Sequence, residues 1–466
     1  MSRPMPLLPS RYKTFDYDTT MKTSNYKPLQ HIAAEKGWIN DPNGLVFYRG
    51  YYHVFFQYYP NDTKWGPMHW GHAITKDFKD IEYLEPALYP DEAGMCFSGS
   101  AIVKDDVLYL LYTVCRHTEE GDVQEQAIAS SVDGRSFKKE GVVIASDDLD
   151  LTKYSKFDFR DPCVWEHGGR FYLMAGVKKL ASTSNILMFE SRDLFHWTML
   201  GEVLPSDISG GMVECPDYHE ELGLLMFSEQ FSKPEGDKHL NEHTKRYIIG
   251  KLSYETGRIA VEREDIIDYG FDFYAAQSVK PQGIMLAWMD MWDRDNPSAA
   301  YGFAGMLTCP RKLSLQNGRL CQAPIVHGEV TETLVNQPEI KTTMFIGSFE
   351  WELHHATSFK ILLNKGDAHC TSVEGKDGNV IFDRSRSGVT ITGKEEDEYS
   401  KKGQRVMPLS EKEDHKLVVV IDKYSVELFL DGQAMTNAAY HLDGDDALEL
   451  YTDAEESVFR KRVLPS

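Results

Sequence analysis

The sequence lacks the features that mark membrane proteins and nucleic-acid-binding proteins. Its 466 residues hold no run approaching the ~20 apolar residues that a membrane-spanning helix needs. Lys and Arg number 50 against 72 Asp and Glu, a formal net charge of −22. A chain with this balance offers no broad cationic face to phosphates, and an anionic membrane surface repels it. We therefore expect neither nucleic acid nor a membrane among its partners.

Paired cysteines, targeting signals and metal motifs are also missing. The seven Cys residues are scattered without a Cys-x-x-Cys pair, which favours free thiols over disulfides or a zinc site. The start of the chain, MSRPMPLLPSRYK, has no apolar core of signal-peptide length, so we expect a cytoplasmic protein. His69 and His72 would point to opposite faces of a strand, with no third ligand nearby. We expect no bound metal.

Helical periodicity is scarce, whereas short runs of Val, Ile, Leu, Phe and Tyr bounded by Gly, Asn and Asp are frequent. They predict strands at 44–57 (two strands), 106–113, 169–176, 222–228 and 283–289. A polar segment precedes each of these, at intervals of 53 to 63 residues, centred on Asp41, Ser98, Asp161, Glu214 and Asp272. Five all-β units of similar length predict a five-bladed β-propeller. The alternative is an irregular all-β sandwich with coincidental spacing.

The repeats fade after about residue 320. Beyond it, strict alternation and Asp-Gly turns indicate an antiparallel β-sandwich, most clearly at 348–353 and 416–432. The predicted organisation is an N-terminal extension (1–26), a propeller (27–320), a connector (321–345) and a sandwich (346–466).

Three carboxylates stand at the heads of three separate repeats. Asp41 and Asp161 each precede a proline, which favours an extended backbone, and Glu214 begins the segment ECPD. Taken singly, each has a plainer interpretation as a turn former, a local ion pair or a solvated surface residue. Innermost strands of a propeller begin near one end of its axis, so the three acids can converge there. Carboxylates among many aromatic rings fit a sugar site, and two carboxylates across a sugar perform glycoside hydrolysis.

Four motifs occur in a fixed order: WINDPNG (38–44), FSGSA (97–101), FRDP (159–162) and ECPD (214–217). With them the chain strongly resembles glycoside hydrolase family 32, the β-fructofuranosidases, from about residue 27 to its C-terminus. The resemblance implies a five-bladed propeller followed by a sandwich, in agreement with the repeats.

The resemblance also implies roles for individual residues. Asp41 matches the nucleophile, Glu214 the general acid/base, and Asp161 the aspartate that binds fructose hydroxyls and stabilises the transition state. Residues matching the substrate pocket are Trp38, Asn40, Gln57, Trp65, Phe97, Ser98, Arg160, Asp268, Tyr274 and Trp292. No cofactor is needed. We expect Asp41 and Asp161 to raise the pKa of Glu214, and Arg160 to keep Asp161 ionised.

The resulting expectation is a retaining β-fructofuranosidase acting on sucrose, sucrose 6-phosphate or short fructo-oligosaccharides. A fructosyltransferase on the same scaffold and an inactive sugar-binding protein are the alternatives. The sequence does not separate the three substrates, and it leaves a homo-oligomer open.

Overall fold

The structure is a computed structural model that describes residues 26–393 and 402–464, so nearly all of the predicted N-terminal extension lies outside the described residues. Strands dominate this part of the chain. Its helices are three short 3-10 turns, η1 (Ser146–Asp148), η2 (Glu220–Leu222) and η3 (Pro297–Tyr301). No helix in the described ranges is long and apolar enough to cross a membrane.

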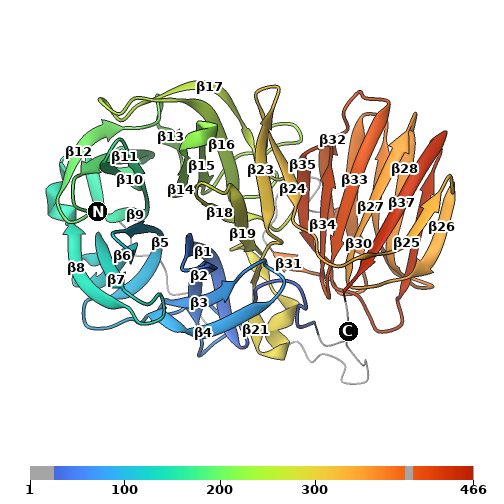
Figure 1. Cartoon of the computed structure of the whole chain (residues 1–466), viewed down its shortest axis with the longest axis horizontal. Helices are drawn as coiled ribbons and strands as arrows, with labels where there is room; N and C mark the ends of the chain where they lie inside the picture. The colour runs from blue at the N-terminus through green and yellow to red at the C-terminus, as the bar shows by residue number, and fades with distance from the viewer. Residues whose placement is uncertain (1–25, 394–401, 465–466) are drawn as a thin grey trace.

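Five antiparallel sheets follow one another along the chain and surround one axis (Figure 1). Each is built on four strands, in the order in which the sequence supplies them. They are β1 (Gly37–Tyr48), β2 (Tyr51–Tyr59), β3 (His69–Thr75), β4 (Ile81–Leu88); β5 (Met95–Lys104), β6 (Val107–Thr118), β7 (Gly121–Ser131), β8 (Lys138–Ile144); β9 (Tyr154–His167), β10 (Arg170–Lys179), β11 (Thr183–Ser191), β12 (Trp197–Glu202); β14 (Val213–His219), β15 (Leu224–Glu229), β16 (Thr244–Leu252), β17 (Ile259–Ile266); β18 (Tyr274–Val279), β19 (Ile284–Met289), β23 (Arg311–Gln316) and β24 (Arg319–Pro324).

The innermost strands of the five sheets form a ring. They contact one another in the order β1, β5, β9, β14 and β18, and β18 contacts β1 again. The sheets are joined by packing rather than by one continuous hydrogen-bonded ladder. A short strand from the fifth repeat, β21 (Phe303–Ala304), pairs with β1 in parallel and ties the last unit to the first. Three further short strands are β13 (Ile208–Ser209), β20 (Arg294–Asp295) and β22 (Met306–Leu307).

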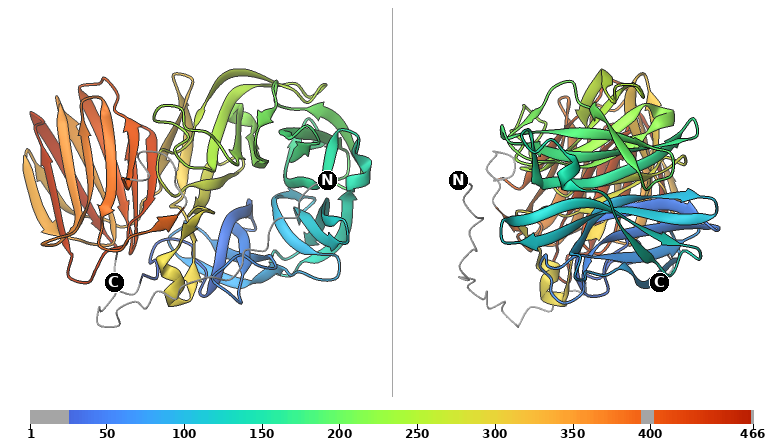
Figure 2. Two further views of the ribbon diagram at one scale, coloured as in Figure 1. Left: turned by 180° about the vertical axis from the view of Figure 1, so that it is seen from behind. Right: turned by 90° about the vertical axis from the view of Figure 1, so that its left-hand side faces the viewer.

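The C-terminal part is a sandwich of two six-stranded sheets, stacked beside the propeller in both Figure 1 and Figure 2. Trp351, Phe359, Phe382 and Phe459 lie in its core. One sheet orders β25 (Val330–Val335), β37 (Glu456–Val463), β27 (Gly347–His354), β33 (Asp414–Ile421), β34 (Ser425–Leu430) and β35 (Gln433–Ala438). The other orders β26 (Glu339–Thr343), β36 (Ala447–Thr452), β28 (Ser358–Lys365), β29 (Cys370–Lys376), β30 (Asn379–Arg386) and β32 (Gln404–Pro408), while β31 (Thr392–Gly393) pairs with β20. The predicted all-β fold class is confirmed.

Residues 321–345, expected to form a connector, contain strands of both domains. Strand β24 completes the fifth sheet of the propeller, and β25 and β26 are edge strands of the two sandwich sheets. Most side chains of β25 and β26 are exposed. Because an exposed edge strand needs no alternating apolar face, its sequence resembles a loop.

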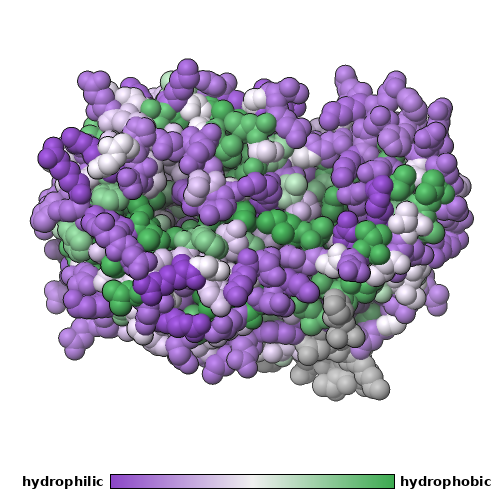
Figure 3. Space-filling model, in the orientation of Figure 1, coloured by the Kyte–Doolittle hydropathy of each residue, from purple (hydrophilic) through white to green (hydrophobic). Residues whose placement is uncertain are grey.

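The molecular surface in the orientation of Figure 1 is mostly hydrophilic, and its hydrophobic residues are exposed in scattered groups (Figure 3). This agrees with the net charge of −22. All seven Cys residues are unpaired, and five of them are buried.

A buried ionic network joins the two domains. The Arg311 side chain on β23 donates to Asp268 at 2.9 Å and to Glu427 of the sandwich at 2.7 Å. His31 lies between Glu427 and Asp422, at 2.9 Å and 2.7 Å. All five side chains are fully buried, which is tolerable only because each charge has partners of opposite sign.

We expect the stability of this joint to depend on pH through His31. Burial alone would lower the His31 pKa, but hydrogen bonds and charges from Asp422 and Glu427 raise it to about 9. The folded pKa exceeds the ordinary value of 6.5, so the ionic contribution is complete below pH 6.5 and is lost as pH rises through about 9. Its size is about 3 kcal/mol by linkage.

The difference in melting temperature between the wild type and His31→Gln should therefore be largest near pH 6 and should shrink by pH 10. His117→Gln, at an exposed histidine beside Asp122, is the matched control and should change little at any pH. A His31→Gln difference that stays constant over this range would contradict the assignment.

Candidate active site

The pairing of each innermost strand with its neighbour is interrupted by a pair of unmatched residues, and β1 and β9 each have a second interruption elsewhere in the strand. The interruptions fall at 40–41 in β1, 97–98 in β5, 161–162 in β9, 215–216 in β14 and 275–276 in β18. A bulge of this kind turns side chains away from the regular pleat and is frequent beside active sites. These bulges on five converging strands place the side chains of Asp41, Ser98, Asp161 and Cys215 around one point.

The backbone is strained at three of these bulges. Asp161, Cys215 and Ala275 have φ angles of 66°, 45° and 53°, in the left-handed region that residues other than Gly seldom occupy. The expectation that Pro162 holds Asp161 extended is therefore wrong. The Asp161 N–H instead donates to Thr113 Oγ1 at 2.9 Å, a buried contact that stabilises the unusual conformation.

Asp41 is held by two neutral donors. Ser98 Oγ donates to Asp41 Oδ2 at 2.6 Å, and Asn40 Nδ2 donates to Asp41 Oδ1 at 3.0 Å. Burial raises the Asp41 pKa; the hydrogen bonds oppose this rise, and the charge of Glu214 adds to it. These donors leave a carboxylate that is oriented but carries no direct ion pair, as a nucleophile requires.

Glu214 is held by a cation. Arg160 donates to Glu214 Oε1 from Nε at 3.0 Å and from Nη2 at 2.7 Å, and the Tyr274 hydroxyl donates to Oε2 at 2.6 Å. Burial would raise the Glu214 pKa, but Arg160 and Tyr274 together bring it below its ordinary value. The expectation of a raised Glu214 pKa is thus wrong, because the Arg160 guanidinium pairs with Glu214.

Asp161 is the acid that keeps a proton in the empty site. Burial raises its pKa to about 7, since the Arg160 charge only partly offsets burial and the charges of Glu214 and Asp41 add to it. The expectation that Arg160 keeps Asp161 ionised therefore fails as well. Within the cluster as a whole, one proton persists up to about neutral pH.

Cys215 links the two aspartates, a role that the sequence did not indicate. Its N–H donates to Asp161 Oδ2 at 2.9 Å, and its Sγ lies 3.4 Å from both Asp41 Oδ2 and Asp161 Oδ2. Cys215 occupies the same bulge position in β14 that Asp161 occupies in β9. That equivalence could have pointed to it, but only once the strand register was known.

Aromatic rings line the approach to the acids. The Trp38 ring stacks on Trp292 with centroids 5.9 Å apart, and Trp38 Nε1 donates to Asn40 Oδ1 at 2.8 Å. Fully buried Trp288 packs behind both. Between β2 and β3 of the same sheet, half-exposed Trp65 meets Phe97 of the next sheet edge to face at 5.9 Å. Such rings offer flat apolar surfaces to the C–H faces of a sugar.

Gln57 supports the same region from β2. Its side-chain amide is buried and donates to the Cys96 carbonyl at 3.0 Å, next to the bulge that carries Phe97 and Ser98. It therefore positions this bulge in the empty site.

Two acids of the fifth repeat do not join the cluster. The Asp268 carboxylate accepts hydrogen bonds from Arg311 at 2.9 Å and from the Thr436 N–H at 2.8 Å, in the domain joint. Asp272 is bound by Arg294 at 2.6 Å and Arg384 at 2.9 Å. Neither is available to a sugar, so the assignment of Asp268 to the substrate pocket is corrected, as is the expected convergence of Asp272.

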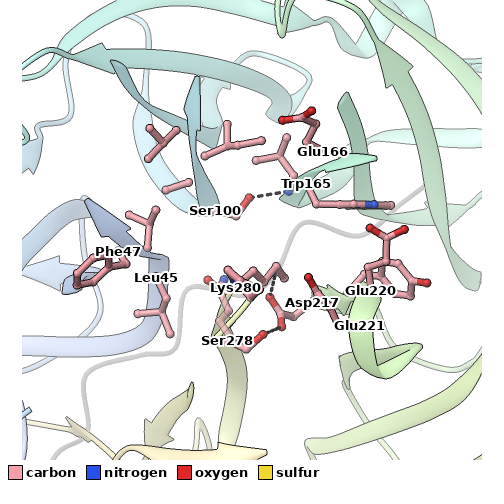
Figure 4. A pocket seen from close by; sticks show the side chains of 18 residues that line it. Leu45, Phe47, Ser100, Trp165, Glu166, Asp217, Glu220, Glu221, Ser278 and Lys280 are labelled. Carbon is pink, nitrogen blue, oxygen red and sulfur yellow. Dashed lines mark hydrogen bonds and ion pairs between the residues drawn. The ribbon is translucent and has the colours of Figure 1, made fainter. Parts of the chain in front are cut away.

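A separate cavity of about 360 Å³ lies toward the other end of the same innermost strands. Its lining residues come later in those strands than the acids do, and Figure 4 shows Lys280 beside Asp217 and Ser278 within it. Lys280 Nζ lies 2.8 Å from the buried Asp217 carboxylate, which this contact neutralises.

Comparison with known proteins agrees with this geometry. Residues 31–324 match the glycosyl hydrolases family 32 N-terminal domain, and residues 318–463 match the glycosyl hydrolases family 32 C-terminal domain. The chain is 32% identical to a sucrose-6-phosphate hydrolase of Zymomonas mobilis, over 90% of this chain and 86% of that protein. It is 32% identical to a raffinose invertase of Escherichia coli, over 95% of each.

Solved structures show the same similarity. A family 32 β-fructofuranosidase variant from Bombyx mori, in complex with sucrose, superposes with a TM-score of 0.81 at 28% identity over 95% of each chain. A sucrose-6-phosphate hydrolase from Lactobacillus gasseri shares the fold, with a TM-score of 0.84 at 24% identity over 94% of each chain. With both of its domains matched in order and its three acids gathered at one end of the propeller, the chain belongs to glycoside hydrolase family 32.

Proposed function

We propose that the protein is a retaining β-fructofuranosidase that releases the terminal β-D-fructofuranosyl unit of sucrose, sucrose 6-phosphate or a short fructo-oligosaccharide. The observation that carries the proposal is the pair of unlike carboxylates. Asp41 is oriented by the neutral donors Ser98 and Asn40, whereas Glu214 is held by Arg160 and the Tyr274 hydroxyl. Two carboxyl groups in different environments fit separate roles as nucleophile and acid/base.

In this mechanism Asp41 attacks C2 of the fructosyl unit while Glu214 protonates the oxygen of the departing sugar. A covalent fructosyl-enzyme results. Glu214 then removes a proton from water, which attacks C2 and releases fructose with its configuration retained. Asp161 binds hydroxyl groups of the fructosyl unit in both steps, and the rings of Trp38 and Trp292 border the sugar.

The substrate completes the protonation state that this reaction needs. The shared proton favours Asp161, whose pKa burial raises to about 7, over Glu214, whose pKa is lowered by Arg160 and Tyr274. Fructose hydroxyls that donate to Asp161 favour its ionised form, since hydrogen bonds to a charged group stabilise the charge. The proton then moves to Glu214, where it serves the leaving group.

Substrate preference is tested by measuring kcat/KM on sucrose, sucrose 6-phosphate, kestose and inulin in parallel. The names of the relatives, a sucrose-6-phosphate hydrolase and a raffinose invertase, support small soluble saccharides. Equal yields of glucose and fructose from concentrated sucrose indicate hydrolysis, whereas glucose in excess indicates transfer to another sugar. Absence of turnover on all four would refute the proposal. A cytoplasmic location and a homo-oligomer stay predictions.

Removing the charge of Asp41 should abolish activity, whereas removing the charge of Asp268 should lower stability. Asp41→Asn should lower kcat on sucrose about a thousandfold or more with little change in melting temperature, because it removes the nucleophile from a bulge. Asp268→Asn should lower the melting temperature but leave kcat of the folded enzyme near wild type, because Asp268 serves the domain joint. Retention of a tenth of wild-type kcat by pure Asp41→Asn would reject its role.

The loss of rate on removal of the acid/base should depend on the leaving group of the substrate. Glu214→Ala should abolish sucrose hydrolysis, because glucose departs poorly without a proton. An aryl β-fructofuranoside with a good leaving group should form the fructosyl-enzyme at close to the wild-type rate, and the intermediate should accumulate. Azide needs no base, so it should restore turnover and yield β-fructosyl azide, identified by NMR. Equal losses on both substrates without azide rescue would reject Glu214 as the acid/base.

The Tyr274 hydroxyl should set the alkaline limit of activity. It donates to ionised Glu214, so Tyr274→Phe removes a stabilising contact of the charged form and raises the Glu214 pKa. The acid then keeps its proton to higher pH. The alkaline limb of the kcat profile, which reports the enzyme–substrate complex, should move up by about one pH unit, the equivalent of one lost hydrogen bond to a charge. A limb that stays in place or moves down would contradict this.

A further inference from the structure

A buried lysine lies behind the acid cluster. Lys245, on β16, is 2% exposed, and its Nζ donates to the Cys215 carbonyl oxygen at 2.8 Å rather than to a carboxylate. Lys280, which lines the separate cavity, differs from Lys245 in having a carboxylate, that of Asp217, as its ion-pair partner. Burying an ammonium group is costly unless nearby negative charge compensates it.

The strand register explains how Lys245 reaches the site. Lys245 pairs across β16 and β15 with Ser228, and Ser228 pairs across β15 and β14 with Glu214. Cross-strand partners lie on one face of a sheet, so the three side chains form one row. Ser228 in the middle is small, which leaves room for the lysine side chain to extend over it to the Cys215 peptide.

The contact connects Lys245 to both aspartates. The Cys215 peptide whose carbonyl binds Lys245 belongs to the residue whose N–H binds Asp161, and whose Sγ touches Asp161 and Asp41. Burial lowers the Lys245 pKa, while the charges of Asp217, Asp41 and Asp161 oppose that effect. Burial holds the pKa of the Cys215 thiol well above its usual range, so the thiol adds no charge.

The charges of the buried cluster can then be counted. Asp41, Asp161 and Glu214 face two cations, Arg160 and Lys245. Among the neighbouring charges, Asp217 pairs with Lys280, and Arg246 pairs with Glu229 and Glu264. Asp158 lies 3.5 Å from Arg160 but is partly exposed, so water screens its charge, and it is not counted with the buried acids. Burial lowers the pKa of His243, which is neutral. Three acids against two cations are balanced when one proton is bound, the state that double displacement needs.

We propose that Lys245 is a positioning residue of the active site: it fixes the Cys215 peptide and supplies the counter-charge that keeps Asp41 ionised while the cluster holds a single proton, and that stabilises ionised Asp161 once this proton is on Glu214. This inference rests on the proposed β-fructofuranosidase activity. It assigns the acidic limit of that activity to Lys245, whereas Tyr274 and Arg160 act on Glu214 and govern the alkaline limit.

The test compares the kcat/KM profile on sucrose between pH 4 and 9 for the full-length wild type, three variants at Lys245 and one control variant. Lys245→Gln keeps a donor for the Cys215 carbonyl but removes the charge, and Lys245→Met removes both. In both, the aspartates should protonate more readily, and the acid limb should move up by about one pH unit. One pH unit below the wild-type limb, activity should fall about tenfold. Lys245→Arg should keep the wild-type acid limb.

Lys251→Met is the matched control, since it removes a charge from an exposed position on the same strand, and its profile should match the wild type. A Lys245→Gln acid limb at the wild-type pH would overturn the inference, as would an upward shift in Lys245→Arg. If Lys245→Met does not fold, Lys245→Gln and Lys245→Arg still decide it. A folded wild type that cleaves neither sucrose nor sucrose 6-phosphate would refute the proposed function instead.

Discussion

The constraint on which the site depends is the burial of three carboxylates around one point. Each charge removed from water costs free energy. Hydrogen-bond donors and cations from several blades must therefore compensate for the lost hydration. Ser98 and Asn40 serve Asp41, Arg160 and Tyr274 serve Glu214, and Cys215 serves Asp161. These partners are unequal in charge, and the three acids therefore differ in proton affinity although they share one pocket.

The fold and the three acids could be predicted because short segments of the sequence suffice to indicate both. Each blade repeats an apolar strand after a polar head, and four of the five predicted heads, at Asp41, Ser98, Asp161 and Glu214, adjoin or occupy the bulges of the innermost strands. Cys215 and Lys245 could not be found in this way. Their contacts depend on which residues stand opposite each other on neighbouring strands, and a single sequence does not specify that register.

Asp268 and Asp272 show which feature of an acid cannot be predicted from its own repeat, namely the partner that binds it. Asp268 and Asp272 stand before the last innermost strand in the same polar and aromatic setting as the catalytic heads, but their partners, Arg311 and Arg384 among them, come from β23 and β30. Which side of a blade a head residue faces is decided by the domain packed against that blade. A pattern within one repeat carries no information about that domain. The exposed edge strands at 330–343 could likewise not be predicted from their local sequence pattern.

The sandwich thereby takes part in the geometry of the site. Arg384 of β30 and the Ala438 N–H of β35 bind the Asp272 carboxylate, two residues before Tyr274 in the chain. Tyr274 in turn donates to Glu214. The start of β18 is thus fixed on one side by the sandwich and presents its tyrosine to the acid on the other. Through these contacts of Asp272, the second domain acts on the proton affinity of Glu214 without touching the substrate.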